Sequence, residues 1–180
     1  MHLIRQARAE DLPALLQMQA DSLLALGAEH YPRPVLDAAL SRLGTMDARL
    51  VTDGTYLVLE VGSRFAGSAG WSLHAPNYAA LMAEPLQPLP GRTGLVRSVY
   101  VSPDFARRGL GRRLMQTVEQ RLVALGVQTS ELMATMSGAP LYATLGYREL
   151  SAHALRVAPG LDFEVRRMAR CLDQRAARAA

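Results

Sequence analysis

The sequence has almost no cysteine, no lysine and no long hydrophobic run, and each absence excludes a class of protein. Cys171 is the single cysteine among 180 residues, so the chain can form neither an internal disulfide nor a cysteine-rich metal site. No segment approaches the roughly 18 consecutive apolar residues that a membrane-spanning helix needs. Residues 1–8 also lack the apolar core of a secretion signal. We therefore expect a soluble, cytoplasmic protein that binds no metal and no membrane.

The composition is that of a folded chain. Hydrophobic residues make up 49% of the sequence and charged residues 20%, which is too apolar for a disordered protein. A chain of this length is long enough to bury one sizeable core. We expect a single domain over residues 1–173 and a frayed tail of mainly alanine and arginine over residues 174–180.

All 20 basic residues are arginine, and the formal net charge is +4. Twelve of the arginines fall in two clusters, at 92–121 and at 166–178. A basic cluster can serve the phosphates of a small ligand, a nucleic acid, or solvation alone. The chain has no DNA-binding motif and no aromatics interleaved with the arginines, so we expect no nucleic-acid partner. The first cluster is the stronger candidate for a phosphate site because it contains glycines.

Apolar periodicity predicts a mixed α/β fold, in which a mixed sheet of about six or seven strands is flanked by about four helices. Strands are expected at 3–7, 55–61, 65–74, 95–101, 129–135, 149–157 and 162–168, and helices at 12–26, 34–43, 110–125 and 139–145. The first helix is expected to turn one face inward, formed by Leu12, Leu15, Leu16, Gln19, Leu23 and Leu26. The proline-rich stretch 75–92 is expected to be a lid or an insertion, with a helical turn from Tyr78 to Met82.

The segment from Val99 to Leu114 carries the clearest chemical signal. A strand is followed there by a turn that contains Gly109 and Gly111, and then by an amphipathic helix. The start of a helix offers free backbone N–H groups and the positive end of the helix dipole, so it binds anions. Glycine lets the backbone approach a phosphate closely. Four arginines flank this turn, namely Arg107, Arg108, Arg112 and Arg113. The pattern predicts a pyrophosphate site, although it is neither the dinucleotide fingerprint nor the nucleotide P-loop.

This segment resembles the cofactor motif of the GNAT (acyl-CoA-dependent N-acetyltransferase) family, Gln/Arg-x-x-Gly-x-Gly/Ala. Residues Ala106–Gly111 align with it, with Ala106 in place of the usual Gln or Arg. The strand Val99–Val101 is similar to the family's splayed strand, which pairs with the pantetheine arm like an added β-strand. A second segment, Ser137–Tyr147, resembles the family's Ala-x-x-Leu/Phe-Tyr-x-x-x-Gly-Phe/Tyr signature.

The resemblance implies a GNAT-like fold with a splayed central strand, acetyl-CoA as acyl donor, and a primary amine of a small molecule or peptide as acceptor. It assigns donor binding to Val99, Tyr100, Val101, Arg107, Arg108, Gly109, Leu110, Gly111 and Arg112. It assigns to Tyr142 the role of proton donor to the departing thiolate, and we expect the Val101 backbone N–H to polarise the thioester carbonyl. A homodimer is left open.

The general base is not identified by the sequence. The strand 95–101 contains no carboxylate, although relatives often carry a glutamate there. Glu131 on the next strand is offset by one residue and is expected to face the other way. His74 and Glu60 are weaker candidates, and transfer through ordered water needs no dedicated base.

Other side chains have open roles. Arg97 could face the acceptor or pair with a carboxylate. Tyr78 and Tyr100 could line the acceptor pocket, whereas Trp71 is expected in the core. Two other functions stay open. One is a non-catalytic acyl-CoA-binding or sensing module, which would agree with the missing base and with Ala106. The other is nucleic-acid binding through the arginines.

Overall fold

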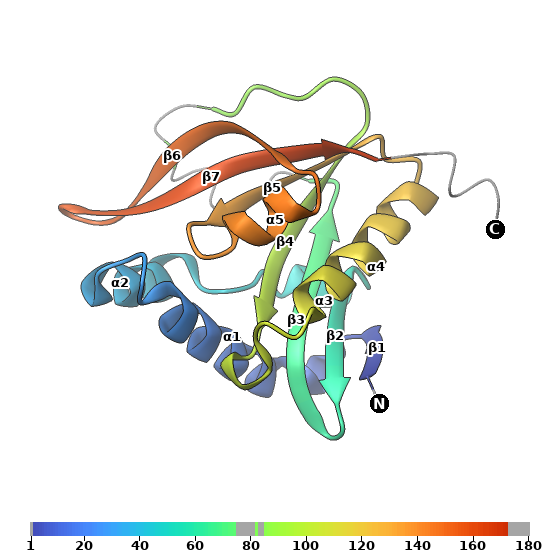
Figure 1. The fold of residues 1–180 in the computed structure, drawn as a ribbon, viewed down its shortest axis with the longest axis horizontal. Coiled ribbons are helices and arrows are strands. Elements are labelled where there is room, and N and C mark those ends of the chain that lie inside the picture. The colour runs from blue at the N-terminus through green and yellow to red at the C-terminus, as the bar shows by residue number, and fades with distance from the viewer. Residues whose placement is uncertain (1, 75–81, 83–84, 173–180) are drawn as a thin grey trace.

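The computed structural model describes residues 2–74, 82 and 85–172, and its strands form one seven-stranded sheet (Figure 1). The sheet order is β1-β2-β3-β4-β5-β7-β6. All pairs are antiparallel except β4 and β5, which run parallel. The strands are β1 (His2–Gln6), β2 (Tyr56–Val61), β3 (Arg64–Ser72), β4 (Thr93–Val101), β5 (Thr129–Thr135), β6 (Arg148–Ala158) and β7 (Leu161–Cys171). The mixed sheet predicted from the sequence is thus confirmed.

Within the described ranges, five α-helices accompany the sheet. They are α1 (Leu12–Gly27), α2 (Arg33–Leu43), α3 (Arg49–Thr52), α4 (Leu110–Ala124) and α5 (Ala139–Thr144), with short 3₁₀ turns η1 (Ala9–Asp11) and η3 (Pro103–Phe105). Proline lies in the first turn of α1, α2 and α5, where its missing N–H costs no hydrogen bond. The order of elements follows the prediction, with the one-turn helix α3 as an addition. No helix in the described part of the chain is long and apolar enough to cross a membrane.

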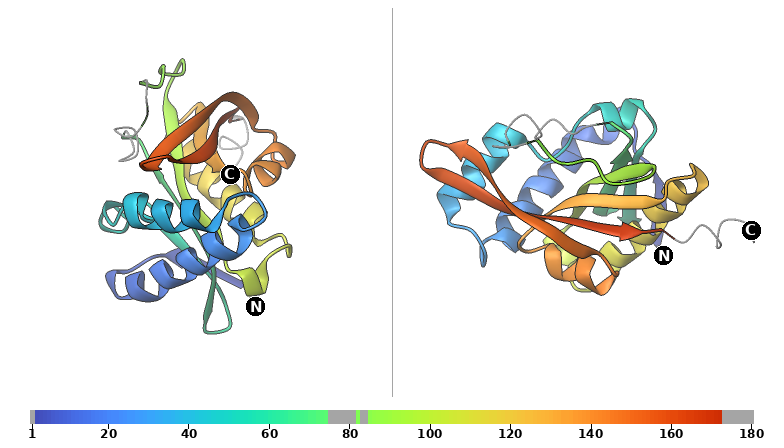
Figure 2. Two further views of the ribbon diagram at one scale, coloured as in Figure 1. Left: turned by 90° about the vertical axis from the view of Figure 1, so that its left-hand side faces the viewer. Right: turned by 90° about the horizontal axis from the view of Figure 1, so that it is seen from above.

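The helices cover both faces of the sheet, and the alternation of side chains along β2 shows why. Leu57 and Leu59 are buried in a cluster that also contains Leu114 of α4. Tyr56 and Val58, on the opposite face of the same strand, are buried with residues of α1 and α3. Figure 2 shows α1, α2 and α3 on one side of the sheet and α4 and α5 on the other. The result is a three-layer arrangement.

The expected inner face of α1 needs correction at two positions. Leu15, Gln19 and Leu23 are buried as predicted, but Leu16 is 43% exposed and Leu26 is 38% exposed. Leu16 lies about 100° around the helix from Leu15, at the margin of the apolar stripe. Leu26 is on the inner side but in the last turn, where it borders a cavity rather than the core.

The central strands diverge, as the resemblance predicted. β4 and β5 pair only from Thr93–Thr129 to Val96–Leu132, although β4 continues to Val101 and β5 to Thr135. Figure 1 shows the two strands separating beyond this point. The backbone groups that face the gap are therefore without a strand partner.

Tyr31 stabilises the side of the gap that is formed by the end of β5. Its hydroxyl donates to the Glu164 carbonyl at 2.6 Å and accepts from the Met136 N–H at 2.7 Å. Its ring stacks on Phe163 with centroids 4.6 Å apart. Since Met136 directly follows β5, this tyrosine keeps the end of β5 against β7 and away from β4. The helical turn expected at Tyr78 and the tail at 174–180 lie outside the described residues.

Candidate active site

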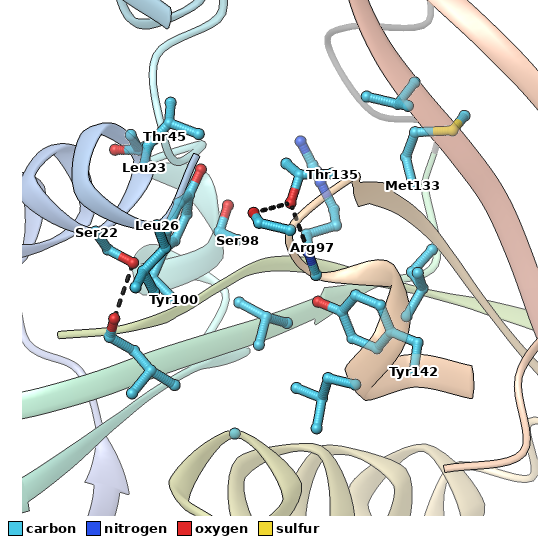
Figure 3. Close-up of a pocket in the computed structure, with 18 of the residues that line it drawn as sticks. Ser22, Leu23, Leu26, Thr45, Arg97, Ser98, Tyr100, Met133, Thr135 and Tyr142 are labelled. Atoms are coloured by element: carbon cyan, nitrogen blue, oxygen red, sulfur yellow. Dashed lines mark hydrogen bonds between the residues drawn. The ribbon is translucent and has the colours of Figure 1, made fainter. Parts of the chain in front are cut away.

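A cavity of about 680 Å³ occupies the gap between β4 and β5 and extends to α1 and α2. This is a typical volume for a small-molecule site. Its lining comes from α1, α2, the segment 44–47, β4, the turn before α4, β5, α5 and the β6–β7 hairpin. Figure 3 shows side chains from β4, α1 and α5 converging on it. The site is therefore built from segments spread over most of the chain.

The N-terminus of α4 forms one end of the cavity and lacks a cap. Its first internal hydrogen bond runs from the Arg113 N–H to the Gly109 carbonyl at 3.1 Å, and no side chain caps the helix. The backbone N–H groups of Leu110, Gly111 and Arg112 are consequently free of helical partners. These residues border the cavity together with Arg107 and Gly109. Such an end attracts an anion through both the free donors and the helix dipole.

Arg108 is the exception among the predicted donor-binding residues. Its guanidinium lies 5.6 Å from the centre of the Phe105 ring, and Arg64 lies 5.0 Å from the same ring. Arg108 does not border the cavity, whereas every other residue assigned to donor binding does. The side chain of Arg108 is thus held at the surface beside η3.

The two glycines of the turn are required for different structural reasons. Gly109 has φ +78°, a left-handed conformation that other residues rarely adopt, and nothing lies within 4 Å of the point where a Cβ would stand. At Gly111 a Cβ would instead lie 2.8 Å from Leu141 Cδ2. Gly109 therefore shapes the turn, while Gly111 allows α4 to pack against α5.

A bulge in β4 adjoins the point where the strands diverge. Ser98 has φ +53°, and the pairing of β3 with β4 shifts by one residue between Ser68–Tyr100 and Gly70–Arg97. The buried Tyr56 hydroxyl lies 3.0 Å from the Ser98 carbonyl oxygen and accepts from Gln19 Nε2 at 2.6 Å. This buried network supports the unusual backbone conformation of the bulge.

The backbone on the C-terminal side of the bulge faces the gap. The Ser102 N–H bonds to the Ala66 carbonyl of β3 at 3.0 Å. Because successive residues of a strand direct their backbone groups to opposite sides, Val99 and Val101 direct theirs away from β3. The Val101 carbonyl accepts from Ser22 Oγ at 2.8 Å, drawn as a dashed line in Figure 3. The N–H groups of Val99 and Val101 are thus available to an extended ligand.

Tyr142 lies on α5 and borders the cavity, as the resemblance requires. The residue is only 7% exposed, and its ring meets Tyr147 edge-on at 5.9 Å. Burial raises the pKa of the phenol well above its usual value of 10.0. Figure 3 shows the hydroxyl directed toward β4 and the middle of the cavity. The tyrosine is therefore a neutral hydroxyl at physiological pH, which can donate a proton.

The three candidate bases from the sequence lie outside the cavity. Glu131 is in a buried, two-pronged ion pair with Arg167, at 2.7 and 3.1 Å. Glu60 bonds Arg5 at 2.6 Å on β1 and β2. His74 is exposed at the end of the segment that follows β3. None of them is placed to take a proton from a group in the gap.

Asp47 is a carboxylate of the site that the sequence analysis missed. It borders the cavity from the segment between α2 and α3, and its side chain is 8% exposed. Arg49 Nη2 lies 2.8 Å from Oδ2, and the Arg49 N–H lies 3.0 Å from Oδ1. The hydrogen bond from Arg49 lowers the pKa of Asp47, against the opposing effect of burial. No motif marks this residue, since only the tertiary fold brings residues 44–47 to β4.

Arg97 extends from β4 into the same part of the cavity. Its Nη1 is 3.7 Å from Asp47 Oδ2, which makes an ion pair but not a hydrogen bond. Arg97 therefore both borders the cavity and pairs with a carboxylate, which are the two alternatives that the sequence left open. Tyr100 also borders the cavity, Trp71 is in the core as expected, and Tyr78 lies outside the described residues. Within the described ranges no group of three or more His, Cys, Asp or Glu could hold a metal.

Comparison with known proteins matches residues 12–147 to the acetyltransferase (GNAT) family. Among solved structures, a GCN5-related N-acetyltransferase from Rhodopseudomonas palustris shares 20% identity, with 94% of this chain and 95% of that one covered and a TM-score of 0.70. The PaiA N-acetyltransferase of Thermoplasma acidophilum, in complex with coenzyme A, shares 14% identity over 95% and 99%, with a TM-score of 0.66. The ribosomal-protein-S18-alanine N-acetyltransferase of Escherichia coli shares 20% over 96% and 95%, with a TM-score of 0.60. No curated protein matches the sequence.

Proposed function

Because the chain belongs to the GNAT family of acetyltransferases, we propose that it transfers the acetyl group of acetyl-CoA to a primary amine of a small molecule or peptide, by direct attack within a ternary complex. One observation carries this proposal. A single cavity runs from the uncapped start of α4, through the gap between β4 and β5, to the side of α1 and α2. The two substrates can therefore meet in the gap from opposite sides.

In this proposal the start of α4 binds the pyrophosphate of the donor. The free N–H groups of Leu110, Gly111 and Arg112 supply hydrogen bonds, and the guanidinium groups of Arg107 and Arg112 supply charge. The Thermoplasma neighbour was solved with coenzyme A, which supports a donor of this chemistry. The pantetheine arm then extends along β4 and pairs with its unpartnered edge.

The backbone of β4 polarises the thioester carbonyl. Val101 is next to the pyrophosphate end of the strand, whereas Val99 is next to the bulge and two residues further from that end. An extended arm reaches Val101 first, so we assign its N–H to an amide of the arm. We assign the Val99 N–H, rather than that of Val101, to the thioester oxygen, where negative charge develops as the amine attacks.

Tyr142 completes the transfer. The amine nitrogen bonds to the carbonyl carbon, the carbon–sulfur bond breaks, and the Tyr142 hydroxyl gives its proton to the departing thiolate sulfur. The nitrogen loses its extra proton to water, because the Asp47 carboxylate is held by Arg49 and its lowered pKa makes it a weak base. Solvent then returns the proton to the phenol.

The experiment that tests this function has two steps. Acetyl-CoA is first titrated into the protein by calorimetry, and micromolar affinity, worth about −8 kcal/mol, is expected. Thiol release is then followed with a panel of primary amines. Binding without release on any amine would support the alternative function, a non-catalytic acyl-CoA-binding module, which the weak basicity of Asp47 favours. No binding by a folded protein would contradict both.

A further inference from the structure

Arg97 is a cation that faces the cavity, and its hydrogen-bonding capacity is not used by the described residues. Its side chain is only 8% exposed, its ionic contact among those residues is Asp47 at 3.7 Å, and it makes no hydrogen bond with them. A guanidinium has five N–H donors in a fixed fork. Donors that line a largely enclosed cavity are satisfied by water or by a bound ligand.

Asp47 does not fill this need. Its oxygens are already engaged by the Arg49 side chain and the Arg49 backbone N–H, at 2.8 and 3.0 Å. The segment that holds Asp47 thus fixes the position of Arg97 by charge attraction, while the donor fork stays open to the cavity. A planar, two-oxygen anion is the group that matches such a fork.

The position of Arg97 on the sheet indicates that this anion belongs to the acceptor and not to the donor. Val96 is buried with α4, on the donor side of the sheet. Arg97, the next residue, extends to the opposite side, toward the segment between α2 and α3. The donor enters from the start of α4, so a group that meets Arg97 belongs to the molecule entering from the side of α1 and α2.

We propose that Arg97 binds a carboxylate of the acceptor, and that the acceptor is an amine that also carries a carboxylate, as an amino acid does. The inference rests on the proposed function. Arg97 is two residues before Val99, which sets an upper limit of roughly 7 Å on their separation along the backbone. The amine and the carboxylate therefore belong to one small molecule or one residue.

The test compares matched acceptors. Thiol release from acetyl-CoA is measured with L-amino acids and ω-amino acids, each beside the corresponding carboxamide. We expect at least about a tenfold higher kcat/KM for one or more carboxylates over the matched carboxamides, because the carboxamide offers no negative charge to the guanidinium fork.

Variants connect the preference to Arg97. Arg97→Gln is expected to reduce the carboxylate-to-carboxamide ratio to about one through a higher acceptor KM, and Arg97→Lys to restore part of it, since charge returns without the fork. The dissociation constant of acetyl-CoA is expected to stay within about twofold in both variants. Arg33→Gln removes one exposed arginine of α2 that lies outside the cavity, and is expected to keep the full preference.

Four outcomes would overturn the inference. Carboxamides could be used as well as carboxylates, the preference could survive in Arg97→Gln, or only amines without a carboxylate could be acetylated. The fourth outcome is an Arg97→Gln effect seen only with succinyl-CoA, which would place the carboxylate on the donor. Each leaves the proposed acetyl transfer intact. The proposed function itself fails only if acetyl-CoA does not bind or no amine of any class is acetylated.

Discussion

The two halves of the cavity are built in different ways. The half that we propose binds the donor, called the donor half, is lined by residues 99–101, the turn before α4, the start of α4 and α5, and that turn is one continuous run of sequence. The half that we propose binds the acceptor, called the acceptor half, is assembled from the end of α1, the segment 44–47, one position of β4 and the β6–β7 hairpin. Local backbone chemistry defines the first half, whereas tertiary contacts between distant segments define the second.

This difference explains why family membership identifies the donor but leaves the acceptor open. A turn whose free N–H groups bind pyrophosphate depends on backbone conformation, and few sequences produce it. The acceptor half depends on side chains, such as Asp47 and Arg97, that can change without disturbing the sheet. Function in such folds resides in the particular residues of the site rather than in the fold.

The largest expected effect is that of a substitution at Gly109, in the turn of the donor half. A valine there must either adopt the unfavourable φ of +78° or change the turn. We expect Gly109→Val to weaken acetyl-CoA binding at least about 100-fold, or about 3 kcal/mol, by calorimetry.

Gly160 provides the matched control. It has φ +73° in the turn between β6 and β7, also with nothing within 4 Å of its Cβ position. Gly160→Val should lose similar stability yet bind acetyl-CoA normally. If both variants lost affinity equally, the donor half would not depend on this turn.

The next effect tests Tyr142, at the border of the two halves. Tyr142→Phe removes the proton donor and should lower kcat roughly 100-fold, with acetyl-CoA affinity unchanged. Because burial raises the pKa of this phenol, the wild-type rate should not decline as the pH approaches the ordinary value of 10.0.

Tyr147→Phe deletes another buried hydroxyl, which lies 2.6 Å from Ser130 Oγ. It should cost about 1 kcal/mol of unfolding free energy and leave kcat unchanged. A Tyr142→Phe enzyme as active as the wild type would make Tyr142 a packing residue only.

A smaller effect is expected at Gly111, where the helices of the donor half meet. Gly111→Ala places a methyl group against Leu141, and we expect a loss of about 1 kcal/mol in urea unfolding. Leu141→Val should relieve part of this loss in the double variant, giving a favourable coupling energy. Additive effects of the two changes would contradict the packing role.

The smallest effect concerns the acceptor half. Asp47 has a lowered pKa, chiefly because of its hydrogen bond from Arg49. Its ionic contribution to stability is therefore present above the ordinary value of 3.8 and is lost as the pH falls through the lower, folded-state value. Asp47→Asn should be less stable than the wild type at pH 7, and the difference should shrink in acid, as followed by urea unfolding.

Asp37→Asn disrupts an exposed ion pair with Arg33 and serves as the control. We expect it to change the unfolding free energy by no more than about 0.5 kcal/mol. An Asp47→Asn variant whose deficit stayed constant into acid would show that packing, not charge, accounts for the contribution of Asp47.

The sequence predicted the order of elements and the glycine turn before α4 well, because their signals are local. The alternation in β2, the apolar stripe of α4 and the glycine turn each depend on neighbouring residues. Tyr142 was reached through the resemblance of residues 137–147, and its position on the cavity agrees with it.

The acceptor half could not be predicted in the same way. Asp47 lies in a short connection without periodicity, and the one-turn helix α3 beside it is too short to leave a pattern. Arg108 was assigned to the donor site by its place in the motif beside the glycine turn, whereas its side chain is held over Phe105. The exposure of Leu26 likewise depends on a cavity whose lining includes residues of β4, about seventy positions further along the chain.

The separation of β4 from β5 has a consequence for the behaviour of the protein in solution. Unpaired strand edges at a surface recruit other chains and promote aggregation. Here the unpaired edge lies within the molecule, with α1 packed at one end through the Ser22–Val101 hydrogen bond and the other strand tied back by Tyr31. An extended ligand can pair with this edge from the cavity, whose lining segments surround the gap. The protein can thus offer strand-like hydrogen bonds to a substrate without exposing an unpaired strand edge to other protein molecules.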